Sequence, residues 1–101
     1  MKKIMKTIYK YPLETTDKQT VSLKKGYEIL YVGMDPSDKL CLWAKVDTDA
    51  PKAKCTVYVL GTGNPMPSED KNSYVEMDYI GSVKDNARVL AVFMWHIFVG
   101  K

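Results

Sequence analysis

Histidine, cysteine and arginine are scarce in this sequence, and each scarcity excludes a class of function. The 101 residues include one histidine, His96, and one arginine, Arg88. A nucleophilic hydrolase needs a nucleophile, a base and a group that orients the base, yet the one histidine lies inside an apolar run. Two cysteines, Cys41 and Cys55, have no partner at a metal-ligand spacing and are too few for a disulfide scaffold. We expect both to be buried as small apolar side chains.

Long apolar segments are also missing. The longest apolar run, Val89–Val99, is about half of what a transmembrane helix needs. The N-terminus is basic like the start of a signal peptide, but Lys6, Lys10 and Pro12 interrupt any apolar stretch behind it. We therefore expect no membrane span and a location in the cytoplasm of the cell that makes the protein.

The charge pattern argues against nucleic-acid binding. The formal net charge of +3 comes from fourteen lysines and one arginine against twelve acids spread along the chain. Nucleic-acid readers usually cluster basic residues and favour arginine for bidentate contacts. The densest basic stretch is N-terminal and is typical of an edge strand kept soluble by its lysines: Lys2, Lys3, Lys6 and Lys10.

The composition is that of one globular domain over residues 1–101, with 46% hydrophobic and 27% charged residues. Short, β-branched apolar runs alternate with turn formers, so the sequence predicts a mostly antiparallel β protein. We expect about six or seven strands, in a single small sheet, a partly open barrel or a sandwich, with at most one short helix. The predicted strands cover Ile4–Tyr11, Gln19–Leu23, Tyr27–Val32, Lys39–Asp47, Lys54–Leu60, Tyr74–Val83 and Arg88–Val99.

Turn formers connect the middle strands. Residues 33–38 predict a hairpin turn, in which Asp35 and Asp38 can bond nearby backbone N–H groups. After a second turn at residues 47–51, the strand Lys54–Leu60 is expected to extend the hairpin into a meander. Alternation in the strand Lys39–Asp47 predicts one core-facing set of side chains: Leu40, Leu42, Ala44 and Val46.

The last strand is apolar on both faces, which is typical of a strand that is central or covered by an interface. Its face with Met94 and Phe98 would also carry His96. A helix over residues 86–98, with Asn86 as its N-cap, is the competing interpretation, and β-branched and aromatic residues favour the strand. Since so short a chain has little with which to cover both faces, we expect a homo-oligomer, most simply a dimer.

Two carboxylate pairs have the i, i+2 spacing that places both groups on one face of a strand: Asp47 with Asp49, and Glu76 with Asp78. Turn chemistry explains the first pair and a solvent-exposed strand face the second. Neither pair has a third ligand at a plausible spacing. The sequence therefore predicts no metal, no cofactor and no catalytic residue.

The remaining candidate site is a ligand pocket. Gly61, Thr62, Gly63 and Asn64 follow an apolar strand and could bring backbone N–H groups to a phosphate, although a tight loop explains the glycines equally well. We name Arg88 and His96 as candidate anion contacts and Trp43 or a tyrosine as a surface for stacking a base. Together they predict a site for a small nucleotide-like ligand.

Five segments, which together extend over most of the chain, resemble a family of short, uncharacterised proteins of bacteriophages and prophages: TIYKYPLETTDKQTVSL, LCLWAKVDTDAP, GTGNPMP, YIGSV and WHIFVGK. The resemblance implies phage origin and residence in the host cytoplasm, and it brings no activity or catalytic residue.

By analogy with small phage proteins that lack catalytic residues, we expect a non-enzymatic binding protein. Its leading role is counter-defence by sequestering a nucleotide-derived signal molecule. Inhibition of a host defence or regulatory protein is the alternative, and an accessory role in the virion or its assembly is the second alternative.

Overall fold

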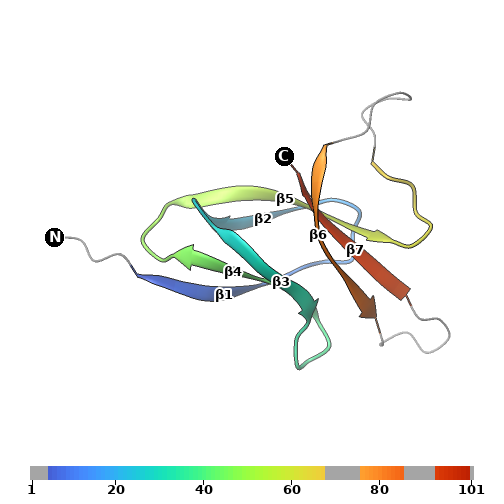
Figure 1. The fold of residues 1–101 in the computed structure, drawn as a ribbon, viewed down its shortest axis with the longest axis horizontal. Coiled ribbons are helices and arrows are strands. Elements are labelled where there is room, and N and C mark those ends of the chain that lie inside the picture. The colour runs from blue at the N-terminus through green and yellow to red at the C-terminus, as the bar shows by residue number, and fades with distance from the viewer. Residues whose placement is uncertain (1–4, 68–75, 86–92, 101) are drawn as a thin grey trace.

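The computed structural model describes residues 5–67, 76–85 and 93–100, and the described residues form seven strands and no helix (Figure 1). The strands are β1 (Lys6–Pro12), β2 (Gln19–Lys24), β3 (Glu28–Met34), β4 (Leu40–Asp47), β5 (Lys52–Gly61), β6 (Met77–Asp85) and β7 (Phe93–Gly100). All strand pairs are antiparallel. The mostly β class predicted from the sequence is thus confirmed. None of the described residues belongs to a helix that could cross a bilayer.

The strands form two sheets, with the orders β1-β4-β3 and β2-β5-β7-β6, so the single sheet offered among the expected architectures is wrong. The predicted hairpin of β3 and β4 is present, but the predicted meander from β4 to β5 is wrong. After the turn at residues 48–51 the chain passes to the other sheet, where β5 lies between β2 and β7. The physical reason is that the part of β5 from Val57 to Leu60 is buried on both faces, as is normal for a central strand, and β2 and β7 are the strands that flank it.

The core lies between the two sheets. The predicted face of β4 points into it, with Leu42 and Ala44 fully buried. Val57 and Val59 of β5 and Ile97 of β7 pack from the other sheet into the same cluster. Both cysteines are buried and unpaired, as expected.

Strand β7 is central in its sheet, as its apolar composition predicted. The competing helix is wrong for residues 93–98, which pair with β5 and β6. Residues 86–92 lie outside the described residues. Lys84 and Asp85 still belong to β6, where they pair with Met94 and Phe93.

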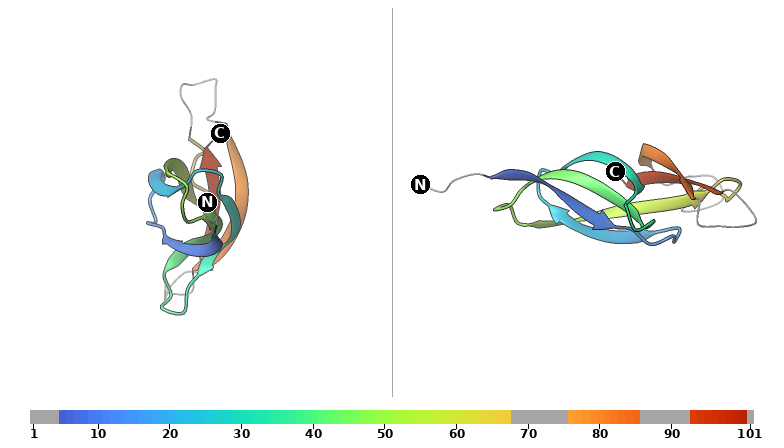
Figure 2. Two further views of the ribbon diagram at one scale, coloured as in Figure 1. Left: turned by 90° about the vertical axis from the view of Figure 1, so that its left-hand side faces the viewer. Right: turned by 90° about the horizontal axis from the view of Figure 1, so that it is seen from below.

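The two sheets meet along a seam between the edge strands β3 and β6, which lie side by side (Figures 1 and 2). A methyl carbon of Val32 on β3 lies so close to Gly81 on β6 that a Cβ at Gly81 would come within 2.5 Å of it. The two strands belong to different sheets and share no ladder, so the barrel is not closed.

Each edge strand at the seam contains one β-bulge, at Leu30 in β3 and at Ile80 in β6. A bulge inserts one extra residue, so the side chains after it change face relative to a regular strand. Ile29 therefore packs on the core, whereas Tyr31 pairs with Trp43 on the outer face.

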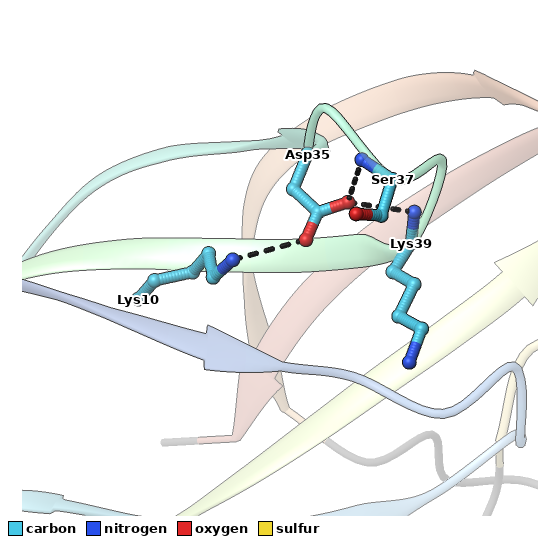
Figure 3. A network of polar contacts seen from close by, with 4 residues as sticks. All are labelled: Lys10, Asp35, Ser37 and Lys39. Carbon is cyan, nitrogen blue, oxygen red and sulfur yellow. Dashed lines mark hydrogen bonds and ion pairs between the residues drawn. The ribbon is translucent and has the colours of Figure 1, made fainter.

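The β3–β4 turn is held by Asp35, one carboxylate oxygen of which accepts the backbone N–H groups of Ser37 (2.8 Å) and Lys39 (3.0 Å) (Figure 3). The other oxygen accepts the ammonium of Lys10 on β1 at 3.0 Å. The bond from the Lys39 backbone, followed by that from Lys10, lowers the pKa of Asp35 to about 2. This cluster confirms the predicted turn and fastens the edge strand β1 to the hairpin.

Candidate functional site

A chain of three hydrogen bonds crosses the outer face of the four-stranded sheet. The Oγ1 of Thr62 lies 2.7 Å from the Nε2 of His96, and the Nδ1 of His96 lies 2.8 Å from the Oγ of Ser82. The Ser82 hydroxyl in turn lies 2.6 Å from the hydroxyl of Tyr79. We call these four residues, Thr62, His96, Ser82 and Tyr79, the hydroxyl–imidazole chain. Both ring nitrogens of the histidine are therefore engaged.

The turn after β5 brings Thr62 to the sheet. Gly61 is the last residue of β5, and Asn64 donates its N–H to the Gly61 carbonyl at 3.0 Å. Gly63 has a φ of +92°, a conformation that favours glycine. The Thr62 N–H bonds the Met94 carbonyl of β7 at 3.2 Å, which fixes the turn against the strand that carries His96.

Strand register places the other members. Ser82 of β6 lies directly opposite His96 of β7, and Tyr79 lies opposite Phe98. In a regular strand, residues 79 and 82 would point to opposite faces. The bulge at Ile80 puts both on the outer face, which is why the Tyr79 hydroxyl can reach Ser82.

Tyr79 also supplies an exposed aromatic ring beside the chain. It is 59% exposed and packs edge-on against Phe98, with ring centroids 5.4 Å apart. Tyrosine at such a position offers a flat apolar surface together with a polar tip. A planar ligand could therefore stack next to the hydroxyls.

The structure unites part of the predicted site. Gly61, Thr62, Gly63 and Asn64 form one turn, and His96 bonds its second residue. Trp43 does not join them, because it lies on β4 in the other sheet and packs against Tyr31 with centroids 5.6 Å apart. Arg88 lies outside the described residues.

Sequence reasoning did not name Ser82, and it offered a tyrosine for stacking without naming Tyr79. Simple alternation would place residues 79 and 82 on opposite faces, and the bulge at Ile80 brings them onto one face. The Gly81-Ser82 pair after Tyr79-Ile80 was the available signal, since glycine inside a strand often marks a bulge.

Two of the surface depressions of the molecule are lined by described residues. A groove of about 300 Å³ lies at the seam, lined by residues 31–34 of β3 and 82–84 of β6. It reaches Ser82, so the hydroxyl–imidazole chain borders it. The other, of about 520 Å³, lies between residues 12–15 and the β3–β4 turn and includes no predicted site residue.

The carboxylate pairs do not form a site. The Asp47 carboxylate accepts the N–H of Asp49 at 3.0 Å, which is the turn chemistry expected for that pair. Glu76 and Asp78 are exposed. In the described ranges, no three His, Cys, Asp or Glu side chains gather closely enough to hold a metal ion.

The chain belongs to a family described as a domain of unknown function, DUF7352, whose model matches residues 5–101. No curated protein and no solved structure matches it. The description of the family assigns it no function, so functional inference depends on the geometry of the outer face.

Proposed function

We propose that this protein is a phage-encoded, non-enzymatic binding protein that sequesters a small nucleotide-derived signal molecule in the host cytoplasm as a counter-defence. The observation that supports the proposal is the contact between Thr62 and His96, which joins the glycine-containing turn to a sheet surface bearing an exposed aromatic ring. Hydroxyl, imidazole and backbone N–H groups suit a phosphate, and an aromatic ring suits a base.

Tyr79 takes the stacking role that the sequence gave to Trp43 or a tyrosine. It lies on the same face as His96, whereas Trp43 lies on the other sheet. Arg88 remains the proposed guanidinium contact on sequence grounds alone.

Calorimetric titration with cyclic nucleotides tests the proposal. Tyr79→Ala removes the ring and should weaken binding by about tenfold, as expected for the loss of one stacked base. Tyr79→Phe keeps the ring and should lose less affinity than Tyr79→Ala, and Arg88→Ala should weaken binding of the phosphate. The matched control is Tyr9→Ala on the three-stranded sheet, where the ring is also exposed. Equal affinity of Tyr79→Ala and wild type would refute a site at this face.

Inhibition of a host protein is the second candidate, and a different surface favours it. The outer face of the three-stranded sheet carries large exposed side chains, with Ile8 57% and Tyr31 62% exposed and Leu30 at its edge 45% exposed. Apolar side chains gathered on one face are typical of a protein-binding surface. A stoichiometric host partner that is captured by wild type and by Tyr79→Lys, but lost with Tyr31→Lys, would support this candidate over sequestration.

The homodimer expected from the last strand also stays a prediction. One face of β7 packs into the core through Ile97, while Met94 and Phe98 on the other face are only partly buried. Light scattering after size exclusion should give twice the mass of the chain at tens of micromolar protein, a concentration at which a modest interface is filled. A monomer at that concentration would contradict the prediction.

A further inference from the structure

The hydrogen bonds of the hydroxyl–imidazole chain can be donated in either direction along it. Each direction gives the Thr62 hydroxyl a different chemical role. A neutral imidazole has one N–H donor and one acceptor nitrogen, whereas hydroxyls both donate and accept. If Nδ1 carries the proton, Nε2 accepts from Thr62, which becomes a histidine-activated hydroxyl as in a nucleophilic enzyme. If Nε2 carries the proton, Thr62 accepts from the ring and its own proton points away from it.

We infer that the hydrogen bonds of the hydroxyl–imidazole chain are donated in the direction from Tyr79 to Thr62. Thr62 then accepts from His96 and donates its own hydroxyl proton to an acceptor oxygen of the ligand. A phenol is more acidic than an aliphatic alcohol and is the better donor, so Tyr79 donates to Ser82. Ser82 then donates to Nδ1 of His96, since one hydroxyl has one proton to give. With Nδ1 accepting, Nε2–H donates to Thr62.

The charged form of the ring gives Thr62 the same orientation. An imidazolium donates from both nitrogens, so Thr62 and Ser82 both accept and the Thr62 proton still points outward. Two of the three protonation states of His96 therefore make Thr62 an outward donor.

The ligand that fits is an oxyanion, and among the proposed ligands that means the phosphate of a nucleotide. Thr62 is exposed and precedes Gly63, whose backbone can approach a ligand closely because it has no side chain. Lys84 is exposed two residues beyond Ser82 and adds a positive charge on the same face of β6. This identification of the phosphate rests on the proposed function, whereas the direction of the chain does not.

The direction is measurable because His96 is the one histidine in the sequence. Long-range proton–nitrogen NMR correlation, at a pH where the ring is neutral, should show Nε2 protonated and Nδ1 unprotonated. Tyr79→Phe and Ser82→Ala should each raise the share of the Nδ1–H tautomer. Tyr31→Phe on the other sheet is the matched control and should leave the His96 signals unchanged. A wild-type ring protonated on Nδ1 would overturn the inference and would make Thr62 a candidate nucleophile.

Inorganic phosphate is the probe for the outward donor, with the ring signals of His96 as the readout. Thr62→Ser keeps the hydroxyl and should bind like wild type, while Thr62→Val should bind about tenfold more weakly, the loss expected for one hydrogen bond to a charged group. Amide spectra of both variants establish that they are folded. Equal affinity of a folded Thr62→Val variant would overturn the donor role of Thr62. If phosphate binds neither form while Nε2 carries the proton, the phosphate ligand is refuted and the direction of the chain stands.

Discussion

The two outer faces of the molecule share one arrangement and differ in what its tyrosine meets. In each sheet an edge strand has a bulge next to a tyrosine, and the tyrosine packs on an aromatic ring of the neighbouring strand: Tyr31 on Trp43, and Tyr79 on Phe98. The ring of Tyr31 then lies over Gly33, where a Cβ would come within 2.5 Å of it. The hydroxyl of Tyr79 instead meets Ser82 and, through it, His96.

This difference shows that a tyrosine next to a bulge can either pack its ring on the sheet or place its hydroxyl in a hydrogen-bonded chain. Over glycine, a tyrosine ring covers backbone and adds apolar contact. Beside serine, the same side chain becomes the end of a polar chain that crosses β6 and β7 and ends in the turn after β5. The outer face of the three-stranded sheet therefore suits a partner with apolar side chains, and that of the four-stranded sheet suits a small polar ligand.

Glycine substitutions give the largest expected contrast between the two faces. Gly81→Ala places its new methyl group against Val32, which is buried at the seam, and should destabilise the fold by about 1–3 kcal/mol through overpacking. Gly33→Ala first meets the far end of the exposed Tyr31 side chain, which can shift, and should cost less than about 1 kcal/mol. Urea unfolding of both variants measures the difference, and equal losses would show that the seam is not tightly packed.

The ion pair of the three-stranded sheet should give the next largest effect. Asp35→Asn loses the ammonium contact of Lys10, so its thermal midpoint at neutral pH should fall by several degrees. The lowered pKa of Asp35 means that its contribution is complete above about pH 4 and is lost as the pH falls through about 2. The gap between wild type and variant should close over that range. A gap that keeps its full size at pH 2 would contradict the role of the charge.

Tyr27, between β2 and β3, should make stability depend on alkaline pH. A hydrogen bond with the Cys55 thiol, together with burial, raises the pKa of Tyr27 to about 12. The folded state therefore holds the phenol proton more tightly than the unfolded chain, and its stability falls as the pH rises from 10 to 12. Tyr27→Phe should show a shallower fall over that interval in denaturant titrations, and an identical slope would refute the assignment.

Removing single tyrosine hydroxyls should give the smallest effect. Tyr79→Phe loses the bond to Ser82 on an exposed surface and should cost about 0.5–1 kcal/mol. Tyr31→Phe keeps the ring over Gly33 and should be nearly neutral. Differential scanning calorimetry on the matched pair measures both, and a larger loss for Tyr31→Phe would reverse the comparison of the two faces.

Local patterns were sufficient to predict the elements. The alternation from Leu40 to Val46 predicted the core face of β4, and the apolar composition of β7 predicted a central strand. The turn formers around Asp35 predicted the hairpin. These features depend on neighbours within a few residues, which a sequence shows directly.

Features that depend on partners far along the chain were not predictable. The passage from β4 to the second sheet depends on which strand pairs with β5. The residues of the turn at 48–51 do not indicate that pairing partner. Simple alternation would place residues 79 and 82 on opposite faces, and the bulge at Ile80 brings them onto one face, so the bond between Tyr79 and Ser82 was not predictable. Thr62 and His96 were both named as site residues, but the turn that joins them emerges only from the fold.

The two buried cysteines lie in different sheets, Cys41 in β4 and Cys55 in β5, with 1% and 3% of their surface exposed. Burial raises the pKa of the Cys41 thiol, so this group is also poorly ionised where it lies. An alkylating reagent can reach either sulfur only when the surrounding strands separate, and the rate of modification then follows the frequency of that opening. The protein thus contains one natural reporter of local unfolding for each sheet, and the two rates show which sheet opens first.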